Sequence, residues 1–203
     1  TYWLQFAEKR GGLYKALASL ESCLVASRHS KHLCYSFQPT GRVFSEATNI
    51  FAFDSFSEFA VLQSRVHEAW ARLLSSSMKE DLRYSVSDCF ETLPFPRQDP
   101  RMELPILEEA GKRLYEWRAV FMVETEQGLT AIYNLLKNPT CRDRRIEELR
   151  ELHCEVDRAV LNAYGWTGIS VPPYVAPTTA AEHRAIENFE DEIIDRLSLL
   201  NAQ

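Results

Sequence analysis

The chain has 203 residues, of which 45% are hydrophobic and 26% are charged. This composition is that of a globular protein and excludes a chain that is mainly disordered or fibrous. No apolar run approaches the roughly 18 residues that a membrane-spanning helix needs, and no signal segment opens the sequence, so we expect a cytoplasmic protein with no membrane partner. Because residue 1 is threonine and not methionine, we also expect a piece of a longer polypeptide.

Charge is distributed unevenly along the chain. Residues 1–97 carry a net charge of +1 and residues 98–203 a net charge of −7. Residues 9–42 contain six lysines and arginines but one acidic residue. Such a local basic cluster can meet phosphate groups even in an acidic protein. The alternative is a solvated face without a partner.

The first half is predicted to mix short strands with helices. Residues 13–20 have the pattern of a short helix, and the β-prone runs 23–28, 33–37 and 47–53 follow, with a turn at residues 39–41. Ser55 and Glu58 form a capping box, and apolar residues at helical spacing then predict one amphipathic helix that includes Leu73. Residues 84–95 are predicted to be extended.

The second half is predicted to be helical. The proline-rich residues 94–105 predict a boundary between domains at 1–97 and 98–203. Apolar residues from 107 to 136 predict one long helix with a kink at Gly128. Asp143 is expected to cap a second helix that Gly165 ends, and a capping box at Thr179 to begin a third. The predicted fold class is α+β, a small antiparallel sheet with packed helices followed by an α-helical hairpin or bundle.

Motifs for catalysis are weak, and we do not expect the chain to be an enzyme on its own. Residues 171–174 are similar to the motif with which amino-methyltransferases hold a flipped base, but Val171 cannot accept a hydrogen bond, so they are interpreted as a proline-rich linker. The glycines show no G-x-G arrangement and the five cysteines no C-x-x-C pair, so neither a cofactor nor a metal site is predicted. Cys89 and His153 are interpreted as core residues.

Two polar segments have the chemistry to contact DNA. Residues 28–32 form a polar bridge between β-prone runs, a hairpin loop that can reach a phosphate or a groove. Lys79 and Asp81 share a direction if their segment is extended. A lysine donates to guanine O6 and N7 and an aspartate accepts from cytosine N4, so this pair fits one G·C base pair in the major groove. The alternative is an exposed charged turn.

Several strings, in chain order, resemble the target-recognition domain of MmeI-like type IIG (type IIL) restriction–modification enzymes, which are DNA adenine methyltransferases. These strings are residues 27–28, 30–32, 44–46, 59–64, 67–72, 81–84, 87–92 and 94–96. Further strings resemble the helical C-terminal domain of that family, at residues 128–130, 133–134, 152–153, 157–160 and 163–166. Together the two resemblances cover about the whole chain.

The resemblance implies a sequence-specific DNA-recognition module of a bacterial type II restriction–modification system. In that family one polypeptide carries an endonuclease, a helical connector and an adenine-N6 methyltransferase that uses S-adenosylmethionine. The implied partners are therefore double-stranded DNA and the upstream methyltransferase and endonuclease domains, with no cofactor in this segment. A helical protein-interaction module, whose basic patch only docks a protein, is the alternative function.

The resemblance also assigns roles to single positions. Lys79 and Asp81 fall in the stretch that varies with base preference in the family. Arg28, Ser30 and Lys31 would contact the DNA backbone or base edges, and the expected phosphate contacts are Arg42, Lys79 and Arg83. The acidic second half is predicted to be a poor DNA surface.

Overall fold

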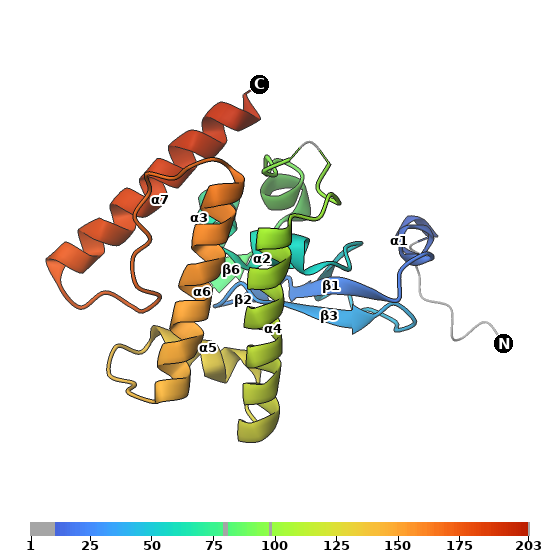
Figure 1. Ribbon diagram of the computed structural model, residues 1–203. Coiled ribbons are helices and arrows are strands. Elements are labelled where there is room, and N and C mark those ends of the chain that lie inside the picture. The colour runs from blue at the N-terminus through green and yellow to red at the C-terminus, as the bar shows by residue number, and fades with distance from the viewer. Residues whose placement is uncertain (1–10, 79–80, 98, 203) are drawn as a thin grey trace.

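The computed structural model describes residues 11–78, 81–97 and 99–202, and it has the predicted α+β fold. Short strands form two antiparallel sheets, each with three strands, and helices surround them (Figure 1). The first sheet has the order β3-β1-β4 and the second the order β2-β6-β5. The strands are β1 (Ser22–Ser27), β2 (His29–Ser30), β3 (Tyr35–Pro39), β4 (Thr48–Phe51), β5 (Ser76–Met78) and β6 (Asp81–Arg83).

The central strand β1 is buried on both faces. Its alternate side chains point to opposite sides of the sheet. Leu24 and Ala26 join the main core, whereas Cys23 and Val25 form a small second core with Leu17 of helix α1 (Gly11–Leu17). The short helix expected near the N-terminus therefore covers the outer face of the first sheet.

Arg28 joins the two sheets through its backbone. Its N–H donates to the carbonyl of Ala47 at 2.9 Å, next to β4, and its carbonyl accepts from the N–H of Tyr84 at 3.0 Å, next to β6. The chain thus leaves β1 and enters β2 without a break in hydrogen bonding. This junction fixes the position of the second sheet, which carries Ser30, Asp81 and Arg83, three of the residues expected to contact DNA.

The amphipathic segment after Ser55 folds as two helices, so the prediction of one helix is wrong. Helix α2 spans Phe56–Gln63 and α3 spans Arg65–Leu74, with Ser64 between them in an extended conformation. The Ser64 hydroxyl accepts a hydrogen bond from the N–H of His67 and donates to the carbonyl of Val61, so it caps the second helix and ends the first. The change of direction leaves Leu73 52% exposed, contrary to the predicted inward position.

The capping box predicted at Ser55 also has a different arrangement. The Ser55 hydroxyl donates to the Glu58 carboxylate and makes no bond to the helix backbone. The first turn of α2 is capped instead by Glu108, whose carboxylate accepts from the N–H of Ser57 at 2.7 Å and from its hydroxyl at 3.1 Å. A residue 51 positions away thus supplies the cap that the local sequence was expected to provide.

Within the segment predicted to be extended, Val86–Phe90 (η2) forms a short π-helix, so that part of the prediction is wrong. The turn places Cys89 in the core, where its thiol contacts the carbonyl of Ala71. The indole N–H of Trp70 donates to the hydroxyl of Thr92 at 3.1 Å and anchors the following residues to α3. Tertiary packing therefore overrides the extended pattern.

The second half is helical, but the predicted long helix is two helices. The left-handed conformation of Glu126 (φ 54°) ends the first, and Gly128 begins the next. The Asp143 cap, the positive φ of Gly165 and the Thr179 capping box match their predicted roles. The helices are α4 (Pro105–Thr125), α5 (Leu129–Lys137), α6 (Arg144–Ala163) and α7 (Ala180–Asn201).

A continuous hydrophobic core joins the two halves of the chain. Helices α4 and α6 run side by side in opposite directions, and α7 lies along the outside beside α3 (Figure 1). Helix α2 packs on α4 around Gly111, and the backbone N–H and guanidinium of Arg65 in α3 both donate to Asp157 in α6 at 2.7 Å. The division at residues 97 and 98 remains a prediction. Among the described helices, none has the length and apolarity to cross a bilayer.

Candidate nucleic-acid interface

The second sheet presents a polar surface to solvent. His29 of β2 pairs with Arg83 of β6, and Ser30 pairs with Leu82. Leu82 is buried, whereas Asp81 and Arg83 on either side of it are exposed, as the alternation of side chains in a strand requires. His29, Asp81 and Arg83 therefore share one exposed face. Two segments that lie about 50 residues apart in the sequence meet here through backbone pairing.

A groove of about 490 Å³ lies beside this face. The exposed side chains of Arg28 and Arg83 both line it, and the hydroxyls of Ser85 and Ser87 lie 3.0 Å apart within it. One carboxylate, that of Asp88, is also present. Two guanidinium groups beside hydroxyl donors form a surface that suits a phosphate group of a nucleic-acid backbone.

The loop after β2 is held in place by hydrogen bonds. The hydroxyl of Ser30 donates to the carbonyl of His32 at 2.6 Å, so part of its bonding capacity is used inside the loop. The carbonyl of Lys31 accepts from the guanidinium of Arg72 at 3.3 Å, and the ring of His32 bonds to Asn134 of α5 at 2.9 Å. The structure thus fixes the backbone that presents the exposed side chain of Lys31.

Of the predicted site residues, Arg42 stands apart from this surface. Lys79 lies outside the described residues. Arg42 is exposed and donates to Gln38. It follows Thr40, whose N–H donates to the carbonyl of Glu21, just before the start of β1. Arg28, by contrast, follows the end of β1. Since β1 has six residues, Arg42 and Arg28 lie at sheet ends about 20 Å apart.

The structure adds His29 to the predicted residues. Its imidazole can donate to or accept from a base edge or a phosphate. Sequence analysis placed it in the polar bridge but gave it no role, because nothing local shows that it faces Arg83. The pairing of β2 with residues 81–83 was the missing information.

A buried polar group supports the inner side of this sheet. His67 is fully buried; its Nδ1–H donates to the carbonyl of Leu62 at 2.8 Å, and its Nε2 accepts from the hydroxyl of Tyr84 at 3.0 Å. Burial lowers the pKa of His67 to about 4, because desolvation disfavours the charged imidazolium. The neutral ring therefore fixes Tyr84, which follows directly on β6.

The segment 171–174, interpreted above as a linker, is irregular and bound to the core. Its backbone carbonyls at Pro172 and Pro173 accept from the guanidinium of Arg65 at 2.6 and 3.3 Å. The ring of Tyr174 is buried and stacks on His153, at 4.2 Å between centroids. The aromatic ring is thus enclosed in the protein and does not present a face to a flipped base.

Side chains that could bind a metal ion are scattered in the described part of the chain. In residues 11–78, 81–97 and 99–202, no group of three or more His, Cys, Asp or Glu side chains is arranged to hold a metal ion. The five cysteines are free thiols. His153, expected to be a core residue, is buried and bonds to the hydroxyl of Tyr133 at 3.1 Å.

Comparisons with known proteins give consistent results. Residues 5–97 match the family model described as MmeI, target recognition domain, which confirms the resemblance seen in the sequence. The chain is 32% identical over 106 residues to DNA methyltransferase A of Bacillus subtilis (strain 168), an alignment that covers 51% of this chain and 10% of that protein.

The fold is also similar to that of a solved structure. The type IIL restriction–modification enzyme MmeI, determined in complex with DNA, matches with a TM-score of 0.54 and 20% sequence identity. The match covers 87% of this chain and 22% of that chain. At this identity the likeness shows the fold alone. The chain thus spans a small share of the length of each of these relatives.

Proposed function

We propose that this chain reads a DNA sequence for a bacterial restriction–modification DNA methyltransferase, because residues 5–97 match the MmeI target recognition domain model. It holds duplex DNA while a separate domain of the same polypeptide methylates an adenine. The match to only 10% and 22% of the two relatives supports a longer polypeptide with further domains. S-adenosylmethionine would be bound by the methyltransferase domain, and an endonuclease domain would be a further partner. A protein with this function would act in the bacterial cytoplasm.

The observation that carries this proposal is the shared exposed face of β2 and β6. It combines His29, Asp81 and Arg83, side chains that can recognise base edges, with the groove at Arg28, which suits a phosphate. The major groove of B-DNA admits a two-stranded β-ribbon. Contacts to the backbone set the register of the duplex, and contacts to base edges determine the sequence that is read. The second sheet offers both kinds of group side by side.

Asp81 is the described residue best suited to read a base. Its carboxylate is exposed at the start of β6 and, as an acceptor, would select the amino group of cytosine. Lys79, two residues before it, would donate to the paired guanine if both side chains share one direction. Each good contact of this kind contributes about 1–3 kcal/mol of discrimination against the wrong base.

The test is a map of methylated bases made by the full-length polypeptide. An exchange of the two charges, Lys79→Asp with Asp81→Lys, should alter the methylated motif at one G·C position. The control is the matched exchange Lys112→Glu with Glu116→Lys, an exposed ion pair on α4, which should leave the motif unchanged.

An unaltered motif after the exchange at 79 and 81 would overturn the base-reading assignment. If methylation is lost altogether, Asp81→Asn tests the same contact with a smaller change, and it should relax the motif at that position. A polypeptide that binds DNA without the steep salt dependence of phosphate contacts would instead favour the protein-interaction module.

A further inference from the structure

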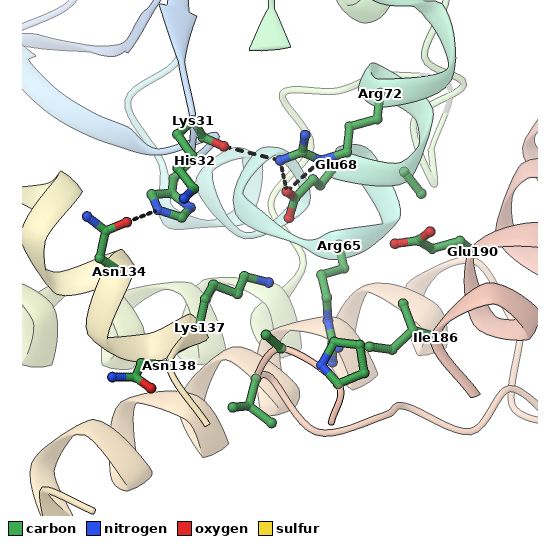
Figure 2. A pocket seen from close by; sticks show the side chains of 14 residues that line it. Lys31, His32, Arg65, Glu68, Arg72, Asn134, Lys137, Asn138, Ile186 and Glu190 are labelled. Carbon is green, nitrogen blue, oxygen red and sulfur yellow. Dashed lines mark hydrogen bonds and ion pairs between the residues drawn. The ribbon is translucent and has the colours of Figure 1, made fainter. Parts of the chain in front are cut away.

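A second hollow, of about 510 Å³, lies between the loop after β2 and helices α3, α5 and α7 (Figure 2). Lys31 belongs both to this pocket and to the loop that follows β2, so the pocket borders that loop. The charged residues that line the pocket are four cations and two carboxylates: Lys31, Arg65, Arg72, Lys137, Glu68 and Glu190.

Two of the cations already have anionic partners. The guanidinium of Arg72 donates to Glu68 at 2.9 and 2.7 Å, and that of Arg65 donates to Asp157 at 2.7 Å. Of the two pocket carboxylates, Glu68 is already paired, and both arginines are engaged in ion pairs. The charge of each arginine is therefore balanced by a carboxylate of the protein.

Lys137, at the C-terminal end of α5, points its amino group into the pocket (Figure 2). Its ammonium lies 4.0 Å from the centre of the Tyr174 ring, and within the described chain no carboxylate forms an ion pair with it. Burial, together with the charges of Arg65 and Arg72, lowers the pKa of Lys137, although Glu68 acts in the opposite direction. A partly desolvated cation without an anionic partner is unfavourable, and an anion in the pocket would relieve that cost.

We propose that this pocket binds a phosphodiester group of the DNA backbone, with Lys137 as its donor. This inference rests on the proposed function, because the duplex read by β2 and β6 supplies the ligand. The acidic second half was predicted to be a poor DNA surface, but α5 carries no acidic residue and ends in Lys137. The helical half thereby contributes a phosphate contact beside the reading surface, and this contact carries no sequence information.

The test measures binding of the full-length polypeptide to a duplex with its motif and to a scrambled duplex, from 50 to 200 mM salt. Lys137→Gln should weaken both complexes alike and reduce the slope of log K against log salt by about 0.9, the value for one phosphate contact. Lys137→Arg keeps the charge and should keep the slope. Glu190→Gln removes the carboxylate that competes with the ligand and should strengthen both complexes.

Matched controls are Lys112→Gln on α4 and Glu187→Gln on α7, exposed residues outside the pocket that should leave binding unchanged. An unchanged slope for a folded Lys137→Gln variant would overturn the proposal, and so would a loss restricted to the motif duplex. Should that variant not fold, Glu190→Gln decides, and unaltered affinity would again overturn it.

A second measurement distinguishes the two possible sources of the phosphate group, the DNA backbone and a free anion. Inorganic phosphate that stabilises the wild type but not Lys137→Gln, while the salt slope of DNA binding is the same for both, would assign the pocket to a free anion and overturn the DNA assignment. Failure of the proposed function has a different signature, because the methylated motif would then be insensitive to the exchange at residues 79 and 81.

Discussion

Gly111 of α4 lies directly against the backbone of Phe56 in α2. A Cβ atom at Gly111 would stand 2.3 Å from the carbonyl oxygen of Phe56 and 3.2 Å from the Cβ of Ala60. The absence of a side chain therefore allows the two helices to approach, and this contact joins the first half of the chain to the helical half.

Gly111→Ala should destabilise the protein by about 1–3 kcal/mol, since overpacking forces backbone shifts. The direction of the change in stability is informative, because alanine in a helix interior is otherwise favoured over glycine by about 1 kcal/mol. Urea denaturation of both proteins measures the difference. Gly168→Ala, at a site with open space, is the control and should change stability by less than about 0.5 kcal/mol. Equal stability of Gly111→Ala and wild type would show that the helices can move apart freely.

Asp157→Ala should cost about 3–5 kcal/mol of folding free energy, because it leaves the buried Arg65 guanidinium without its carboxylate. The same loss would free the N–H of Arg65 at the start of α3. Glu192→Ala removes one partner of the exposed Arg196 pair, and about 0–1 kcal/mol is expected there. Chemical denaturation distinguishes the two. Similar small losses for both variants would contradict a structural role for the Arg65–Asp157 pair.

Stability should fall as the pH is lowered from about 6.5 towards 4. In the unfolded chain His67 has its ordinary pKa of 6.5, whereas burial lowers the folded pKa to about 4, so the unfolded state binds the extra proton in this window. The contribution is fully present above pH 6.5, and about 3 kcal/mol of it is lost by pH 4. His153, whose pKa is also lowered by burial, acts in the same direction.

Denaturation at a series of pH values tests this prediction with His67→Asn, which cannot take up a proton in this range. The variant should lose less stability between pH 6.5 and 4 than the wild type, even if it is less stable at pH 7. His183→Ala, at an exposed position of α7, should keep the wild-type profile. Parallel profiles for the wild type and His67→Asn would show that His67 does not supply the pH dependence.

Arg28→Gln and Arg42→Gln should differ in their effect on DNA binding. Arg28 lines the groove beside β2 and β6 together with Arg83, whereas Arg42 lies at the opposite end of β1. A duplex centred on the second sheet lies closer to Arg28 than to Arg42. Arg28→Gln should therefore reduce the slope of log K against log salt by about 0.9, and Arg42→Gln should reduce it by less. Titrations at several salt concentrations provide the comparison. A larger effect at Arg42 would place the duplex across the turn at the other end of the first sheet.

Features that depend on neighbouring residues were predicted well from the sequence. The Asp143 cap, the capping box of Thr179 and the stop at Gly165 are hydrogen bonds or backbone angles within a few residues. The α+β class and the resemblance to the MmeI family also followed from local patterns and strings. Helical spacing did not separate α2 from α3, because the apolar pattern continues across Ser64. At the second break it predicted a kink at Gly128, where the left-handed Glu126 instead ends the helix.

The sequence by itself determined the α+β class, the caps at Asp143 and Thr179 and the residue types that are available to meet DNA. Only the tertiary structure decided which of those residues share a surface. His29 faces Arg83 because β2 pairs with β6, Glu108 caps α2 from another helix, and Lys137 shares a pocket with Lys31. The physical reason is that strand pairing and pocket lining join groups that are distant in the chain, and these contacts form only when the common core brings the segments together.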